Sequence, residues 1–415
     1  MFFLTDNHYF YIQKQEQTYF SFNSTIRMHV IEVKDKKTAR EFLQLPRIIY
    51  ANDPNWIPHL ETDVRAVFDP SLNQQFQSGE LCRWILKNES GELIGRVAAF
   101  INQNLAHTYK QPTGGMGFFE CINDKESAFL LFDTCKQWLQ ERGMEAMDGP
   151  VNFGEKDRYW GLMVEGNDKK PPYLVNYNPK YYKDLFEAYG FRNYYEQYIY
   201  RIDSSVVLPP IIEKKFERLT ETQGYHFEHL DYKRADKYAE DFRTIYNAAW
   251  SNAHANFKPM TQEKAIQSFK RMKPVVDPEL VVFAYHYDKP VAFFINILEI
   301  NQILKHIKGG LNLWGKLKFL YHKWRGTCRV MYGLVFGVIP EYQNRGLESA
   351  LIITFRNTVI PKGYYHSLVI TWIGDFNPKM NRLLDHIGAK RVYTLITWRK
   401  MFRKDATFER HPVLT

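Results

Sequence analysis

The sequence predicts an α+β fold in which a mixed, mostly antiparallel sheet carries helices on both faces, and this unit occurs twice. Two long stretches read alike, YNPKYYKDLFEAYGFRNYYEQYIYRI from Tyr177 and FNPKMNRLLDHIGAKRVYTLITWRKM from Phe376. In each, a proline opens a helix with an apolar stripe, a glycine stops it, and an alternating strand follows. The same order of elements precedes both stretches, so we expect two domains, at residues 28–205 and 206–415.

Periodicity places the other elements of the two halves in matching order, because a period of two predicts strands and a period near 3.6 predicts helices. The first half is predicted to have strands at 28–35, 80–88, 92–102, 114–122 and 145–153 and a helix at 125–143. The second half is predicted to have strands at 279–287, 290–298, 329–339 and 366–374 and a helix at 348–363. Residues 1–27 follow neither period, and we interpret them as an extension, or as the result of a start placed upstream of Met28.

Composition limits the class of protein. The chain has 415 residues, 45% of them hydrophobic and 24% charged, which suits two globular domains with full cores. It lacks a run of about 18 apolar residues and a secretory hydrophobic segment, so we expect a soluble, cytoplasmic protein. The four cysteines lack metal-ligand spacing, so we expect reduced thiols and no metal site.

The net charge of +9 is concentrated in one segment. Residues 300–340 contain no aspartate or glutamate, and their positive potential would attract an anionic ligand. Because no basic and aromatic RNA-binding motif accompanies this charge, we do not expect a nucleic-acid partner. The basic residues of the segment are Lys305, Lys308, Lys316, Lys318, Lys323, Arg325 and Arg329.

The stretch GVIPEYQNRGLESALI, residues 337–352, directly follows the basic segment. An apolar strand ends at a proline, passes through a polar turn with one glycine, and resumes as a helix. The first turn of a helix exposes backbone N–H groups at the positive end of the helix dipole, and such a cluster binds phosphate. The stretch is therefore a candidate anion-binding site.

This order of elements, with Gln343, Arg345 and Gly346 in the turn, resembles the GNAT superfamily of acetyl-CoA-dependent N-acetyltransferases. A Q-x-x-G turn is a weak motif by itself, and the strand before it and helix after it give it meaning. The stretches FLQLPRIIYANDPNWIPHL, GPVNF, PPYLVNYNPKYY and PVVDPELVV resemble, more narrowly, a bacterial family of tandem GNAT-like proteins, over nearly all of residues 28–402. The resemblance implies two tandem acyl-CoA N-acyltransferase domains, with acetyl-CoA or a longer acyl-CoA as co-substrate.

The resemblance also implies which residues bind CoA. Glu348 departs from the family pattern, which has Gly or Ala there; a carboxylate would disfavour phosphate if it faced inward, and would suit the helix dipole from the solvent side. The first half has NDKESAF at the matching turn, without glycine, so we interpret it as a degenerate copy that binds no CoA. The implied cradle is Gln343, Asn344, Arg345, Gly346, Leu347 and Ser349, and the implied pantetheine strip is Val335, Phe336, Gly337 and Val338.

Acyl transfer to an amine requires a base for the ammonium and an acid for the leaving thiolate. GNAT enzymes often use a tyrosine seven residues after the helix-opening asparagine, but Leu384 occupies that position here. Several groups remain open as substitutes, and the asparagine among them is equally a helix N-cap. The candidates are Asn377, Asp375, Tyr393 and His366, with Glu299 as a further possible base.

The function that these observations predict is acyl transfer from acyl-CoA to a small-molecule amine. Asn152, Glu165 and Asn178 lie in loop-like segments after a strand end in the first half, where they are either candidate contacts for the acceptor or residues with a purely structural role in the turns. The departures at Glu348 and Leu384 leave a catalytically silent acyl-CoA-binding or regulatory protein as the alternative. The segment LNLWGKLKFLYHKW, residues 311–324, has three alternatives: a helix packed on the core, a lid over an acyl chain, or a membrane-surface helix.

Overall fold

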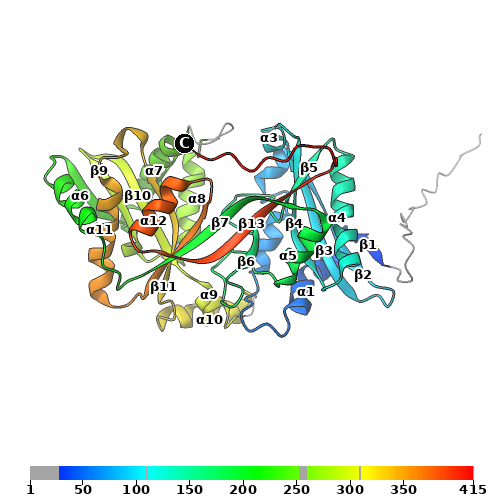
Figure 1. Cartoon of the computed structure of the whole chain (residues 1–415). Coiled ribbons are helices and arrows are strands. Elements are labelled where there is room, and N and C mark those ends of the chain that lie inside the picture. Colours follow the sequence, from blue (N-terminus) through cyan, green and yellow to red (C-terminus); the bar gives the residue numbers. More distant parts are fainter. Residues whose placement is uncertain (1–27, 109, 252–258, 308–309, 415) are drawn as a thin grey trace, which may run out of the picture.

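One continuous sheet runs through both halves of the chain (Figure 1). The computed structural model describes residues 28–108, 110–251, 259–307 and 310–414, so the predicted extension 1–27 and Lys308 lie outside the described residues. The described part contains thirteen strands in the order β1-β2-β3-β4-β5-β13-β7-β12-β11-β10-β9-β8, with β6 paired to β13. The strands are β1 (His29–Glu32), β2 (Gly79–Lys87), β3 (Leu93–Asn102), β4 (Thr113–Cys121), β5 (Ala146–Gly149), β6 (Leu162–Glu165), β7 (Arg192–Asp203), β8 (Tyr225–His229), β9 (Val281–His286), β10 (Lys289–Leu298), β11 (Val330–Val338), β12 (Ser367–Gly374) and β13 (Lys390–Met401).

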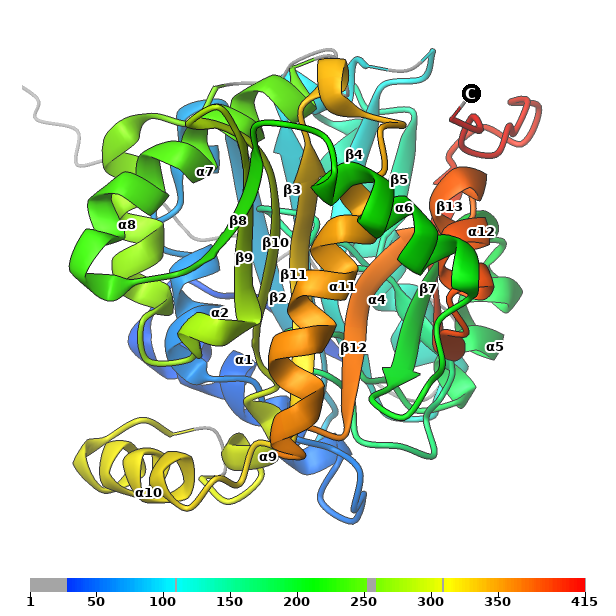
Figure 2. The ribbon, with the colours of Figure 1, turned by 90° about the vertical axis from the view of Figure 1, so that its left-hand side faces the viewer.

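Helices cover both faces of this sheet, as the α+β prediction requires. In the N-terminal half, α4 and α5 bury one apolar stripe on one face, while α1 and α2 cover the other. In the C-terminal half, α7 and α8 lie on one face and α6, α11 and α12 on the other (Figure 2). The helices are α1 (Lys36–Ile49), α2 (Glu61–Val67), α3 (Gln103–Ala106), α4 (Lys125–Gln140), α5 (Tyr181–Tyr189), α6 (Pro210–Thr220), α7 (Ala235–Trp250), α8 (Gln262–Met272), α9 (Asn301–Leu304), α10 (Leu313–Trp324), α11 (Leu347–Val359) and α12 (Pro378–His386).

The two halves exchange their last strands. β7, which ends the N-terminal half in sequence, pairs with β12 of the C-terminal half, and β13 pairs with β5 of the N-terminal half. β7 and β13 also pair with each other, so they form the centre of the sheet. Arg399 on β13 holds Asp148 on β5 through two hydrogen bonds of 2.6 and 2.8 Å. The domain boundary between residues 205 and 206 stays a prediction. In the sheet, β7 lies beside a strand of the C-terminal half and β13 lies beside a strand of the N-terminal half.

Most predicted elements are confirmed, with differences at their ends. The strand predicted at 145–153 stops at Gly149, because Pro150 lacks the N–H that would continue the ladder. The region after it, which the sequence analysis treated as loop, contains β6, paired with the exchanged strand β13. Across the described ranges, every helix is either too short or too polar to cross a membrane.

Candidate functional site

β11 and β12 form a fork. Their parallel pairing runs only from Val330 to Gly333, opposite Ser367 to Ile370. On the other side of β11, the register with β10 shifts so that Leu334 has no opposite residue, which is a β-bulge. Beyond Gly333, the backbone of β11 facing β12 lacks a ladder partner within the described strands. Those N–H and C=O groups are available to a bound molecule with amides of its own.

The arm of the fork on β11 ends in a turn that exposes helix amides. Asn344 and Gly346 both have positive φ, 61° and 94°, and Gly346 is the N-cap of α11. In the part of the chain that the structure describes, no side chain caps this helix. Its first amides therefore point outward at the positive end of the helix dipole, which is the geometry of a phosphate site. All residues of the predicted cradle, from Gln343 to Ser349, lie in this turn and in the first turn of α11.

α6 brings a lysine to the same turn. A β-carbon on Gly346 would lie 3.4 Å from the carbonyl oxygen of Lys215 and 3.6 Å from its Cβ. The side chain of Lys215 is exposed and starts beside this turn. Sequence reasoning missed Lys215 because only the packing of α6 against α11 places these distant segments together.

The predicted pantetheine strip lies along the β11 arm. Val335 and Phe336 are partly exposed, while Gly337 and Val338 are buried. A β-carbon on Gly337 would come within 2.8 Å of the Trp250 ring and 2.9 Å of the Phe293 ring. Glycine is required at this position because a larger residue would displace two aromatic rings from the face of the strand.

A tyrosine lies at the base of the fork. Tyr332 precedes Gly333, is 4% exposed, and its hydroxyl lies 3.4 Å from the Thr371 hydroxyl on the diverging arm of β12. Burial, assisted by the charges of Asp157 and Glu299, raises the pKa of Tyr332 to about 12. The phenol is therefore protonated near neutral pH and is a possible proton donor. Tyr332 is not among the residues predicted from the sequence, although its position directly before Gly333, in the strand that leads to the turn, was a usable signal.

A loop from the N-terminal half reaches this fork. The Trp372 indole on β12 donates a hydrogen bond of 2.9 Å to the carbonyl oxygen of Lys156. The adjacent Asp157 is exposed, and its charge acts on Tyr332. The Asp157 carboxylate pairs with the Arg158 guanidinium at 3.3 Å, so a segment that is distant in sequence contributes an ion pair whose negative charge acts on the base of the fork.

The predicted catalytic residues are not gathered at one centre. Asn377 caps α12 and accepts from the Met380 amide at 3.2 Å, and Asp375 pairs with Arg410. The Tyr393 hydroxyl donates to the Lys170 carbonyl oxygen at 2.7 Å. His366 is exposed at the start of β12, whereas Asp375 follows its end, and nine steps of about 3.3 Å separate them by about 30 Å. His366 and Asp375 therefore cannot act together on one reacting group.

Glu299 is buried where the two halves meet. One oxygen of its carboxylate accepts from the Tyr173 amide at 2.9 Å and from the Asn301 amide at 3.1 Å. Burial raises the pKa of Glu299 to about 7, and the backbone N–H groups oppose that shift. Its charge influences both Tyr332 and Tyr393. The pKa of Glu299 suits a general base. Its hydrogen bond from the Tyr173 amide, however, links the C-terminal half to the N-terminal half, which is a structural role.

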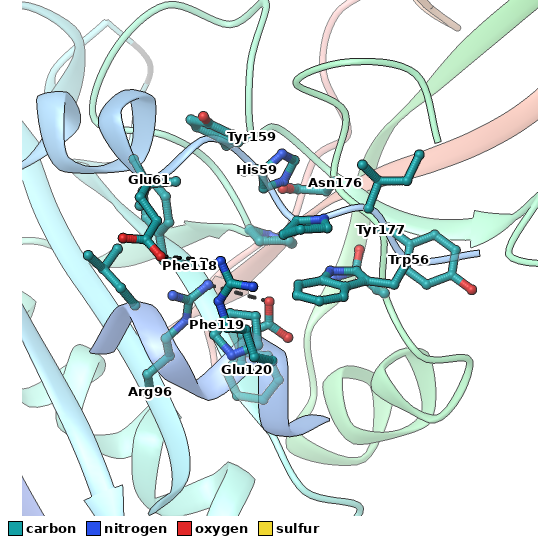
Figure 3. A pocket seen from close by; sticks show the side chains of 18 residues that line it. Trp56, His59, Glu61, Arg96, Phe118, Phe119, Glu120, Tyr159, Asn176 and Tyr177 are labelled. Atoms are coloured by element: carbon teal, nitrogen blue, oxygen red, sulfur yellow. Dashed lines mark hydrogen bonds and ion pairs between the residues drawn. The ribbon is translucent and has the colours of Figure 1, made fainter. Parts of the chain in front are cut away.

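The N-terminal half contains a corresponding fork with a different interior. β4 pairs with β5 only from Thr113 to Gly115, and the register between β3 and β4 shifts near Phe118. A cavity of about 60 Å³ lies there (Figure 3). It has room for a few water molecules and is much smaller than a typical ligand pocket, which occupies about 300 to 1,000 Å³.

A buried polar network forms one wall of this cavity. The Glu120 carboxylate accepts from the Tyr50 and Tyr182 hydroxyls, both at 2.8 Å. Its other oxygen lies 3.5 Å from Arg96 (Figure 3). Burial, with a contribution from Arg96, lowers the pKa of the adjacent His59 to about 4. The histidine is therefore neutral near pH 7.

The helix that follows this second fork is capped by the chain itself. The Asp124 carboxylate accepts from the Ser127 amide at 2.7 Å and from its hydroxyl at 2.6 Å. A carboxylate thus lies where α11 has glycine, and it would repel a phosphate. The two turns therefore differ in their contacts: a side chain caps the start of α4, whereas the start of α11 has no side-chain cap among the described residues. That the N-terminal half binds no CoA stays a prediction.

The three predicted acceptor residues are in different surroundings. Asn178 lines the cavity, and its side-chain oxygen accepts from the Met163 amide at 3.0 Å. Glu165 accepts from the Thr394 hydroxyl on β13 at 2.5 Å. Asn152 is 3% exposed, and neither polar atom of its side chain has a hydrogen-bond partner among the described residues. Contact of these residues with an acceptor stays a prediction.

Comparison with solved structures defines the fold class. A GCN5-related glucosamine N-acetyltransferase region in a fungal multi-domain GH3 β-N-acetylglucosaminidase matches with a TM-score of 0.52 and 11% identity. That match covers 91% of this chain, which spans 38% of the fungal one. A tandem GNAT protein from the clavulanic acid biosynthesis pathway matches with a TM-score of 0.51 and 11% identity, over 92% of this chain and 100% of the other. The chain has a GNAT-like fold, as its sequence predicted.

Two curated proteins are similar over nearly the whole chain. The bacterial ceramide synthase of Caulobacter vibrioides is 28% identical over 383 residues, which cover 90% of this chain and 97% of that protein. Protein YghO of Escherichia coli is 23% identical over 363 residues, which cover 86% of this chain and 91% of that protein. No protein-family model matches the chain.

Proposed function

We propose that this protein is an N-acyltransferase that moves a long acyl group from acyl-CoA to the amine of a sphingoid base. The observation that carries the acyl-CoA part is the fork between β11 and β12, which leads to the uncapped start of α11. The solved neighbours with this fold are acetyltransferases or GNAT proteins. The sphingoid base is proposed because a ceramide is the amide of a fatty acid with such a base, and a ceramide synthase is similar along its whole length.

The binding step uses the exposed amides of the turn. The CoA pyrophosphate accepts from the backbone N–H groups around Gly346 and the first turn of α11, with the Lys215 ammonium beside it. The pantetheine amides pair with the free edge of β11 beyond Gly333. The thioester then reaches the base of the fork, beside Tyr332.

The chemical step involves two proton transfers, one from the attacking amine and one to the leaving thiolate. The neutral amine attacks the thioester carbonyl carbon, a C–N bond forms, and the C–S bond breaks. Asp157 accepts the proton that the amine loses, directly or through water, and the Tyr332 hydroxyl donates a proton to the leaving thiolate. Return of that proton from Asp157 to the tyrosine restores both groups, so the products are an amide and free CoA thiol.

Paired assays test the donor and the acceptor separately. Palmitoyl-CoA or acetyl-CoA is incubated with sphinganine or, as a small polar control amine, with glucosamine, while thiol release and amide mass are measured. We expect amide only with the sphingoid base and faster reaction with palmitoyl-CoA. Amide formed from glucosamine alone would refute the lipid acceptor while leaving acyl transfer intact.

The second candidate is a catalytically silent acyl-CoA-binding protein. Glu348 in the first turn of α11 and Leu384 in place of the common tyrosine favour it. Leu384 is buried in an apolar cluster, so no proton donor replaces tyrosine at that position. CoA binding measured by calorimetry, without amide from any tested amine, would support this candidate over the enzyme.

A further inference from the structure

The outward face of α10 is apolar, which reverses the usual polarity of a surface helix. Trp324 is 83% exposed, Trp314 72% and Leu320 60%. Within the helix, Gly315 is buried, and Phe319 and His322 are partly buried. A helix packed on the core, one of the three alternatives from the sequence, would bury its apolar stripe instead. The large exposed apolar residues are Leu313, Trp314, Leu317, Leu320, Tyr321 and Trp324.

These residues form one continuous stripe. With about 3.6 residues per turn, Leu313, Leu317, Leu320 and Trp324 share one side of the helix. Trp314 and Tyr321 extend that side toward Lys318, and Lys316 and Lys323 border it on the opposite flank. In both views, α10 lies beside α9 and outside the layers of the sheet (Figures 1 and 2). The stripe is therefore a surface of the molecule.

The helix is held in this orientation by its inner side. The Asn312 side chain caps it by accepting from the Gly315 amide at 2.9 Å. The ring of His322 stacks on His306 with centroids 4.4 Å apart, and Phe319 packs against the core of the C-terminal half. The Lys323 ammonium donates to the carbonyl oxygen of Pro274 at 2.6 Å. These contacts fix the apolar stripe toward solvent.

We propose that α10 docks the protein on an anionic lipid bilayer, with its axis in the plane of the interface. Tryptophan near both ends of the stripe and lysine along both flanks suit the depth at which acyl chains meet lipid headgroups. The surrounding segment, residues 300–340, has no acidic residue, so its charge complements anionic lipid. The inference goes beyond acyl transfer and does not depend on it.

The charge around the apolar stripe of α10 favours an anionic bilayer over a second copy of the chain as its binding partner. A dimer through α10 would bring two lysine-flanked stripes together, which like-charge repulsion disfavours. An anionic bilayer instead gains from each lysine near its surface. Sedimentation of the purified full chain with phosphatidylcholine vesicles, with and without phosphatidylglycerol, tests this assignment without any acyl substrate. We expect binding that requires phosphatidylglycerol and weakens with added salt.

Matched variants locate the surface. Leu317→Glu should lower the vesicle partition coefficient by about tenfold or more, because it replaces an inserted apolar side chain with a charge. Leu72→Glu, at another exposed leucine, should leave it unchanged. The double variant Lys316→Gln with Lys318→Gln should lower binding by about fivefold for each lysine, and the same changes at exposed Lys36 and Lys37 on α1 should have a smaller effect.

Three results would overturn the proposal. They are absence of wild-type binding to the anionic vesicles, unchanged binding by Leu317→Glu, and equal binding to vesicles without phosphatidylglycerol. Sedimentation velocity of the same variants provides a further measurement. If Leu317→Glu converted a stable dimer to monomer without affecting vesicle binding, α10 would be an interface between copies. Circular dichroism of Leu317→Glu and Leu72→Glu verifies that both variants are folded.

Discussion

Replacement of Gly346 by alanine tests the phosphate turn most directly. Gly346 has φ of 94°, where an L-residue other than glycine costs about 1 to 2 kcal/mol. Space does not forbid the change, because the new β-carbon would lie 3.4 Å from the carbonyl oxygen of Lys215. The unliganded loop can relieve the strain by moving, and binding must then restore it. We therefore expect the dissociation constant for CoA to rise by about five- to thirtyfold.

Gly143→Ala is the matched control for backbone strain. Gly143 has φ of 78°, a β-carbon there meets nothing within 4 Å, and it lies after α4 in the other half. Gly143→Ala should lose about 1 to 2 kcal/mol of unfolding free energy, measured by chemical denaturation, whereas Gly346→Ala should lose less, because its unliganded loop relieves the strain by moving. In calorimetric titration, the dissociation constant for CoA should rise for Gly346→Ala and stay at the wild-type value for Gly143→Ala. Equal CoA affinity of Gly346→Ala and wild type would refute the assignment of the turn, as would two CoA sites per chain.

Three further predictions concern the fork and the junction of the halves. Tyr332→Phe should lower the rate of acyl transfer by about 10²-fold or more while CoA affinity stays unchanged, measured by thiol release and calorimetry; an unchanged rate would exclude Tyr332 as the acid. Glu299 has a pKa of about 7 in the folded protein, above its ordinary value, so the folded state binds this proton more tightly than the unfolded chain does. Wild type should therefore lose about 3 kcal/mol relative to Glu299→Gln as pH rises from about 4.5 through 7, measured by denaturation; parallel pH profiles would contradict this. Arg399→Met should cost about 3 kcal/mol or more, because Asp148 would lose its buried partner between β13 and β5, and a cost under about 1 kcal/mol would show that this pair does not anchor the exchanged strand.

Local sequence determined the order of elements and the position of the turn. The two Asn-Pro-Lys stretches become α5 with β7 and α12 with β13, because proline, the apolar stripe and glycine each act over a few residues. The start of α11 at Leu347, after Gly346, was also readable, since only glycine adopts this positive φ at low cost. The contrast with Asp124 at the start of α4 followed from the same local reasoning.

The tertiary structure decided which groups meet. The exchange of β7 and β13 could not be read from a repeat, because both pairings satisfy the same alternating pattern. The charge of Asp157 acts on Tyr332 only because a loop of the other half reaches the fork, and Lys215 lies beside Gly346 only because α6 packs against α11. The sequence contains the stripe on α10, but its direction depends on the anchoring of His322 and Phe319. Periodicity reports which residues share a face of an element, whereas the direction of that face depends on contacts between segments that are distant along the chain.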